Sequence, residues 1–133
     1  MRTLSGPWRL VFASGVAALA MFTAGYVAAR SGAGQPKTVI HVVSIQWKQG
    51  VSDEDKQKVL DGVKQMAAGI PGVRNVWIKS ERVEPRGFDD GFAIEFRDRA
   101  SADAYATNPL HKIWNDRYLA MRAASVAIDV TNN

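Results

Sequence analysis

The chain of 133 residues is long enough for one domain, and its lack of cysteine excludes disulfide bonds and thiol chemistry. Its formal net charge of +4 is uneven: three of the 17 Lys and Arg residues lie within residues 1–36, which hold no acidic residue. The remaining 14 accompany 13 Asp and Glu residues, so the rest of the chain is almost neutral. That balance argues against a nucleic-acid-binding surface, which needs a basic face.

An uncharged apolar stretch, Leu10–Ala29, follows the short N-terminal segment that carries Arg2 and Arg9. As a helix it would span ~30 Å, the thickness of the bilayer core. Two interpretations remain open. The stretch is either an uncleaved transmembrane anchor, which its length favours, or a signal peptide cut after Ala29 or Ala33.

Both interpretations predict export, because the basic N-terminus favours the cytoplasmic side. We expect a signal peptide or anchor over residues 1–30, a flexible linker over 31–37 and a folded domain over 38–131. The predicted location is the bacterial cell envelope. The domain would be anchored in the inner membrane and face the periplasm, or be periplasmic or secreted if the leader is cut.

The segment Val39–Lys48 alternates with period two and predicts a strand. Its more apolar face carries Val39, His41, Val43, Ile45 and Trp47. His41 should therefore point into a core or a pocket, where a lone histidine is more often a hydrogen-bonded core residue than a catalytic one.

A helix is predicted from Ser52, which is followed by an acidic first turn at residues 53–55. Gly69 and Pro71 end it. Its apolar residues recur at helical spacing and form one buried stripe. They are Val59, Leu60, Val63, Met66, Ala67 and Ile70.

A second strand is predicted over Val73–Val83, with Val76 and Ile78 on one face and Val73 and Trp77 on the other. A turn-rich loop over residues 84–91 then precedes a third strand, in which Phe92, Ile94 and Phe96 alternate with polar or small residues. The adjacent loop carboxylates Asp89 and Asp90 suggest a cation site, but we interpret them as solvated.

The segment 101–117 predicts a short helix, a break and a second helix. Ser101 is the expected N-cap of the first helix; Asn108 and Pro109 are the expected N-cap and first residue of the second. The break places Tyr105 and His111 on two sides of one corner, where a catalytic or a packing role is open.

The second helix carries an apolar stripe, and a fourth alternating strand covers residues 126–130. The stripe residues are Leu110, Trp114, Tyr118 and Met121, with Ile113 beside them. His111 lies at the edge of this stripe, where it can reach both core and solvent.

The element order β-α-β-β-α-β predicts an α+β, ferredoxin-like fold with both helical segments on one face of an antiparallel sheet. The other face would still hold Ile40 and Val42, with Val76 or Ala93 as further candidates. Because the exposure of such an apolar face to water is unfavourable, we expect a homodimer that packs sheet on sheet.

These features together resemble the stress-responsive A/B barrel (Dabb) family of dimeric α/β barrels. The matching segments are 40–43, 50–52, 70–73, 91–98, 104–105 and 108–111. The resemblance covers the exported domain, excludes the leader, and implies a homodimer with a small cavity between sheet and helices in each protomer.

The resemblance also implies candidate site residues. In plant members that cyclise linear polyketides, a tyrosine and a histidine at the positions of Tyr105 and His111 act as an acid–base pair, and a histidine at the position of His41 lines the cavity. This chain departs from the family at Asn108, where many members have histidine, and at Val59 and Val63, where the cyclases have aromatics. The cyclase substrate therefore does not carry over.

Two functions from different classes follow, and we predict the first, with the second as its alternative. The first is an exported dimer that binds a small apolar ligand without catalysis, in a cavity lined by His41, Val43, Ile45, Val59, Val63 and Trp114. The second is a lyase, cyclase or isomerase acting on a carbonyl compound.

In the enzyme hypothesis His111 is the general base, Tyr105 holds the developing enolate oxygen and His41 orients the substrate. No cofactor is predicted. Other dimeric α/β barrels bind haem, but nothing in this chain favours it, and two histidines without a carboxylate cluster make a poor metal site.

Overall fold

The computed structural model describes residues 34–133, and the predicted leader lies outside the described residues. Residues 36–133 form one compact unit. Between residues 34 and 133, no helix combines the length and the apolar character that crossing a membrane requires.

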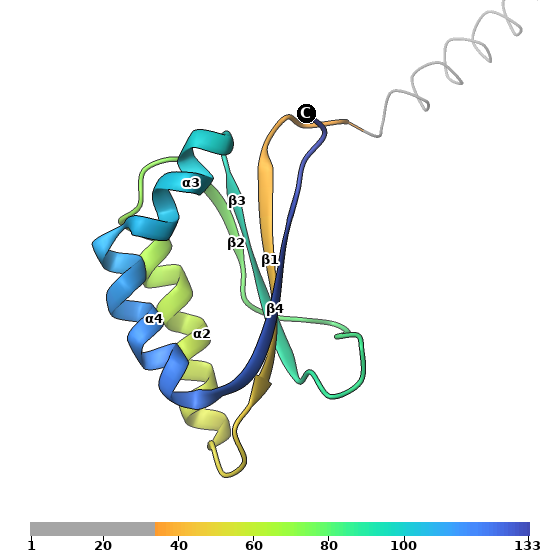
Figure 1. Ribbon diagram of the computed structural model, residues 1–133, viewed down its shortest axis with the longest axis vertical. Coiled ribbons are helices and arrows are strands. Elements are labelled where there is room, and N and C mark those ends of the chain that lie inside the picture. Colours follow the sequence, from red (N-terminus) through yellow and green to blue (C-terminus); the bar gives the residue numbers. More distant parts are fainter. Residues whose placement is uncertain (1–33) are drawn as a thin grey trace, which may run out of the picture. The chain divides into compact units, whose positions relative to one another are not determined.

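Four antiparallel strands and three helices make up the domain (Figure 1). In chain order they are β1 (Val39–Trp47), α2 (Asp53–Ala68), β2 (Val73–Trp77), β3 (Asp90–Phe96), α3 (Arg99–Thr107), α4 (Pro109–Met121) and β4 (Arg122–Val130). The strand order β2-β3-β1-β4, with all three helices on one face, is the ferredoxin-like arrangement. The predicted fold class is therefore confirmed for the domain.

The strand register decides which side chains face the helices. His41 of β1 pairs with Ile94 of β3 on one side and with Asp129 of β4 on the other. Ile94 is fully buried under the helices, so His41 and Asp129 share this helix-facing side.

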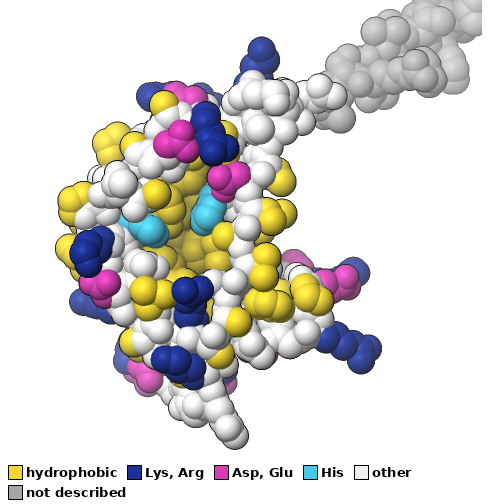
Figure 2. All heavy atoms as spheres, in the orientation of Figure 1, with side chains coloured by type: hydrophobic (Ala, Val, Ile, Leu, Met, Phe, Trp, Pro, Cys, Tyr) yellow, Lys and Arg dark blue, Asp and Glu magenta, His cyan; other side chains and the backbone are white. Residues whose placement is uncertain are grey.

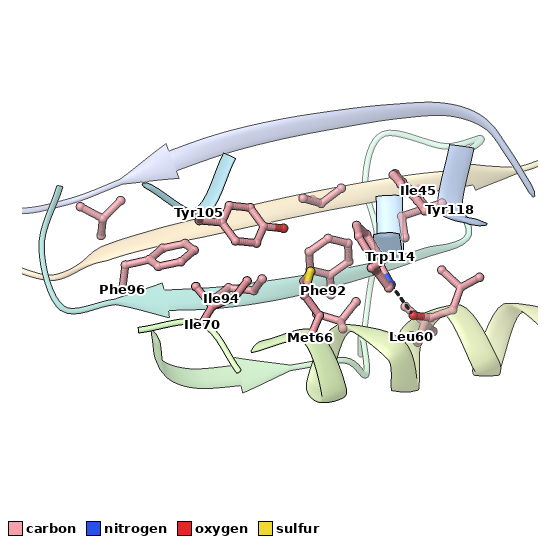
Figure 3. Packing of buried hydrophobic residues seen from close by; sticks show 14 of the residues in the cluster. Ile45, Leu60, Met66, Ile70, Phe92, Ile94, Phe96, Tyr105, Trp114 and Tyr118 are labelled. Atoms are coloured by element: carbon pink, nitrogen blue, oxygen red, sulfur yellow. Dashed lines mark hydrogen bonds between the residues drawn. The ribbon is translucent and has the colours of Figure 1, made fainter. Parts of the chain in front are cut away.

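The core lies between this sheet face and the helices (Figure 3). Its aliphatic and aromatic side chains come from every element except β2 and β4. They include Val43, Ile45, Val59, Val63, Met66, Phe92, Ile94, Phe96, Tyr105, Trp114 and Tyr118. The predicted stripe of α2 is confirmed, because its apolar members are all buried.

Helix caps follow local chemistry, with one difference from expectation. Ser52 caps α2 and Asn108 caps α4 with Pro109 in its first turn, as predicted. The cap of α3 is Asp98, not Ser101: its Oδ1 accepts hydrogen bonds from the Ser101 backbone N–H at 2.8 Å and from the Ser101 hydroxyl at 2.7 Å. The Ser101 and Arg97 hydrogen bonds hold the Asp98 pKa at about 2.

The second strand is shorter than predicted. β2 ends at Trp77, and an irregularity between Val73 and Asn75 shifts its register against β3. This irregularity brings Val73 and Val76 to the same, helix-facing side, so the alternation predicted for them is wrong. Val76 is consequently not part of the open sheet face.

The face of the sheet opposite the helices is apolar and uncovered. Four large side chains on it are about half exposed: Trp77 (48%), Val126 (52%), Ile128 (55%) and Val130 (45%). By register they lie beside Ile40, Val42 and Ala93. We call this set the open sheet face.

The carboxylates of Asp89 and Asp90 are not simply solvated. Asp90 Oδ2 accepts a hydrogen bond from Trp47 Nε1 at 2.6 Å, and Asp89 Oδ2 accepts one from the Trp47 backbone N–H at 3.2 Å. The two residues therefore fix the end of β1 and the position of the Trp47 ring.

Candidate functional site

A concavity opens between the helices and the β1–β4 side of the sheet. Figure 2 shows that its floor is hydrophobic and that the two histidine side chains lie on opposite sides of it. We call it the histidine hollow, and define it by His41, Phe92, Tyr105, His111 and Trp114. These residues come from β1, β3, α3 and α4.

Tyr105 and His111 meet at this hollow because the chain breaks between them. Asn108 ends α3 and caps α4, and its extended backbone turns the second helix away from the first. The Tyr105 and His111 ring centroids are 4.2 Å apart, and the His41 ring lies 5.8 Å from Tyr105. The corner predicted from sequence therefore brings its two residues together, with His41 beside them.

The surroundings of His111 favour a neutral imidazole that is protonated on Nδ1. Its Nδ1 lies 3.3 Å from the Ala106 carbonyl oxygen, which can only accept, so Nδ1 carries the proton. Partial burial lowers the His111 pKa, against the opposing effect of the Ala106 carbonyl. Nε2 then keeps a free lone pair at neutral pH.

Tyr105 is buried and keeps its proton. Burial is the main cause that raises the pKa of its hydroxyl, with the nearby Tyr118 adding to it. In Figure 3 the hydroxyl points toward the end of the core formed by Phe92 and Trp114, away from Phe96. Tyr105 is thus a hydrogen-bond donor over the whole physiological pH range.

His41 is oriented by Asp129, which sequence reasoning missed. His41 Nδ1 lies 2.8 Å from Asp129 Oδ1, and the carboxylate accepts from the Nδ1–H. The two residues face each other across the β1–β4 ladder. The alternation of residues 126–130 placed Asp129 on one face of a strand, but only the β1–β4 register could have paired it with His41.

Aromatic side chains of α4 continue the wall of the hollow. The Trp114 ring is 6.1 Å from His111 and stacks on Tyr118 at 4.9 Å. Trp114 Nε1 donates to the Val59 carbonyl oxygen at 2.9 Å, which fixes the indole (Figure 3). Phe92 meets Trp114 edge to face at 5.5 Å. The rings of His111, Trp114 and Tyr118 therefore form one continuous aromatic stack, in which Trp114 and Tyr118 are almost fully buried.

The structure places the side chains that were expected to line one ligand cavity in different environments. His41 and Trp114 border the histidine hollow, whereas Ile45 and Val63 have no exposed surface and Val43 is almost fully buried. Ile45 and Val63 therefore support the walls from within the core.

Val59 lines a different concavity, a groove of about 400 Å³ between α2 and α4, and Trp114 lines this groove as well. Leu110 and Ile113 line it too, and both are more exposed (40% and 60%) than a stripe facing the core would be. The sequence periodicity placed them on one stripe with Trp114 and Tyr118, but of these four side chains only Trp114 and Tyr118 are buried.

Residues 34–133 contain no group of three or more His, Cys, Asp or Glu side chains placed to hold a metal ion. The chemistry available at the hollow from this part of the chain is that of two imidazoles, a phenol and a carboxylate.

Comparisons with known proteins identify relatives of this chain among solved structures and protein families. No curated protein matches the chain significantly. Among solved structures, a Dabb family protein with a ferredoxin-like fold from Mesorhizobium loti is 21% identical, with a TM-score of 0.62, over 72% of this chain and 97% of its own.

Two further structures share the fold. A dimeric protein of unknown function from Bacteroides fragilis is 19% identical with a TM-score of 0.59, over 74% of this chain and 99% of its own. A hydroxynitrile lyase from Passiflora edulis is 16% identical with a TM-score of 0.65, over 74% of this chain and 95% of its own. The model of the stress responsive A/B barrel domain matches residues 39–132, and the chain therefore belongs to this family.

Proposed function

We propose that the protein binds a small carbonyl compound in the histidine hollow and acts on it, without a cofactor, as a lyase, cyclase or isomerase. The observation that carries this proposal is the convergence of Tyr105 and His111, whose rings are 4.2 Å apart, beside His41. The pKa of Tyr105, the proton donor, is raised, and the pKa of His111, the proton acceptor, is lowered. Such a pair at one concavity is typical of acid–base catalysis.

His111 is the proposed general base. Its Nε2 takes a proton from the carbon next to the carbonyl, and the C–H electron pair becomes the C=C bond of an enolate. The lowered His111 pKa keeps this nitrogen unprotonated near neutral pH, and the Ala106 carbonyl stabilises the imidazolium that forms.

Tyr105 is the proposed electrophilic partner. Its hydroxyl donates a hydrogen bond to the carbonyl oxygen, which strengthens as negative charge develops there. Since burial raises its pKa, Tyr105 does not ionise in competition with the substrate. His41, fixed through Nδ1 by Asp129, presents Nε2 to orient the substrate.

Exchange of substrate protons with deuterium tests this without knowledge of the product. Ketones and β-keto acids would be incubated with the full chain in D₂O, and the loss of the α-proton signal would be followed by NMR. We expect exchange that falls ~100-fold or more in His111→Gln and in Tyr105→Phe. Lys112→Gln, an exposed change on the same helix, should leave it unchanged.

Binding without catalysis is the second candidate, and the apolar floor of the hollow favours it. It predicts that compounds from the same panel bind, as measured by tryptophan fluorescence, while α-proton exchange stays at the uncatalysed rate. That result would contradict the acid–base proposal and leave a ligand-binding module.

We further propose that the open sheet face is covered by a second copy of the chain. Four half-exposed apolar side chains lie on it, and the Bacteroides fragilis relative is dimeric. A two-fold axis through this face would leave both histidine hollows open, because the helices and hollows lie on the other side of each sheet.

Location in the cell envelope is also proposed, from the uncharged stretch Leu10–Ala29 behind Arg2 and Arg9. Cell fractionation with N-terminal sequencing of the mature protein tests it. An intact N-terminus in the membrane fraction supports an anchor, a start at residue 30 or 34 in the periplasm supports a signal peptide, and cytoplasmic recovery contradicts export.

A further inference from the structure

One cation on the helix-facing side of the sheet has no acidic partner. Arg122 is the first residue of β4 and is half-buried. Its guanidinium lies 5.3 Å from the centroid of the Tyr118 ring and donates to the Ser125 hydroxyl. Within residues 34–133 it forms no ion pair, in contrast to Lys56, Lys58, Arg97 and Arg99 on the surface.

The position of Ser125 shows which way Arg122 points. Ser125 pairs with Ile45 across the β1–β4 ladder, and Ile45 is fully buried under the helices. Tyr118 is likewise buried on the sheet-facing side of α4. The guanidinium therefore lies between β4 and α4, at the end of the aromatic wall that begins at His111.

We propose that Arg122 is the anion-binding end of the histidine hollow, and that the substrate is an elongated carbonyl compound bearing a carboxylate. A guanidinium presents up to five N–H donors in a planar fork that matches a carboxylate, and Ser125 and the Tyr118 ring leave part of that fork unused. This inference rests on the proposed function, since it places the anion relative to the acid–base pair.

The opposite end of the hollow determines the orientation. There the Asp129 carboxylate accepts from His41, so a substrate carboxylate at that end would face a like charge. With its carboxylate on Arg122, the substrate extends along Trp114 toward Tyr105 and His111. The apolar floor then accommodates the chain between the two functional groups.

The fold also determines the length of the substrate. Tyr118 lies seven residues after His111 on α4, which is ~10 Å along the helix axis, and the Arg122 guanidinium lies 5.3 Å from the Tyr118 ring. A ligand with its carbonyl directly beside its carboxylate cannot reach both. A chain of about eight carbon–carbon bonds between the two groups can.

Matched probes test the assignment. The first is a linear ten-carbon acid that carries its ketone next to the terminal methyl group, the second is the methyl ester of this acid, and the third is levulinate, a short keto acid. Calorimetry and Trp fluorescence would measure their dissociation constants for the purified full chain in lipid nanodiscs. We expect the long acid to bind about tenfold or more tightly than its ester, and levulinate to bind more weakly than either.

Variants assign the preference to one side chain. Arg122→Met should abolish the preference for the acid and leave ester binding unchanged, which also shows that the variant is folded. Arg122→Lys should retain part of the preference, and Arg99→Met, an equal change of charge on α3, should retain all of it.

Each outcome separates this inference from the proposed function. If acid and ester bind equally to the wild type, or if Arg122→Met keeps the preference, the anion site is refuted while the hollow remains a ligand site. If neither the acid nor the ester binds, both the anion site and a hollow for carbonyl compounds of this length are refuted.

Discussion

Replacing Ile128 with aspartate should dissociate the proposed dimer. Ile128 is on β4 in the open sheet face and leaves 55% of its surface exposed. Complete burial of such a side chain contributes ~1.5–3 kcal/mol, so covering the exposed part contributes ~1 kcal/mol in each copy, or ~2 kcal/mol in a symmetric pair. Burying two carboxylates adds a desolvation cost of several kcal/mol, so the total loss in the free energy of dimerisation exceeds ~4 kcal/mol.

That loss corresponds to a rise of about 1,000-fold or more in the dimer dissociation constant. Analytical ultracentrifugation of the full chain in density-matched detergent measures it. Ile113→Asp is the matched control, because Ile113 is equally exposed (60%) but lies on α4, on the opposite side of the sheet. A dimer that survives Ile128→Asp, or that dissociates equally in Ile113→Asp, would refute the assignment of the open sheet face.

Three further predictions concern stability. Burial lowers the pKa of His111 in the folded state below 6.5, so the unfolded chain takes up this proton first as the pH falls. The contribution of His111 to the free energy of unfolding is therefore complete above pH 6.5 and declines below it. Urea titrations should show this decline in the wild type and a smaller one in His111→Gln. Gly72→Ala should lower the free energy of unfolding by ~1–3 kcal/mol, since Gly72 has φ 86° and an added Cβ would collide with the Ser101 side chain; a smaller loss in the same urea assay would contradict this. Trp114→Phe should lower it by ~1–2 kcal/mol through loss of the hydrogen bond to Val59, and an unchanged midpoint would show that this bond contributes nothing.

Local signals in the sequence were sufficient for most of the architecture. The alternation of Val39–Lys48 identified the helix-facing side of β1, and each of its apolar members is buried there. Asn108 and Pro109 predicted the break that joins Tyr105 to His111, because capping depends only on residues close in sequence. The corner that brings Tyr105 and His111 together was therefore predictable from the sequence.

Features that depend on tertiary contacts were not accessible. The irregularity in β2 puts Val73 and Val76 on one side, where both pack against the core, and no local signal separates that outcome from regular alternation. The His41–Asp129 pair requires the β1–β4 register, which a long crossover does not fix in advance. Arg122 could not be placed because the fourth strand begins four residues earlier than its alternation indicated.

The identity of the N-cap of α3 shows a further limit. Asp98 and Ser101 are both favourable caps, three residues apart, and their side chains bond to each other. The helix begins at the earlier residue, where the Asp98 carboxylate accepts both the Ser101 hydroxyl and backbone N–H. Local preference permits either start, and the hydrogen bonds of the folded segment decide between them.

The most direct test of the acid–base proposal is a nitrogen-15 NMR titration of the two histidines. The chain has only His41 and His111, so two imidazoles are observed, and His41→Gln assigns them. The proposal predicts that His111 is the Nδ1–H tautomer with a pKa below 6.5, leaving Nε2 as a free base at neutral pH. A proton on Nε2 in the neutral form, or a His111 pKa above 6.5, would contradict it.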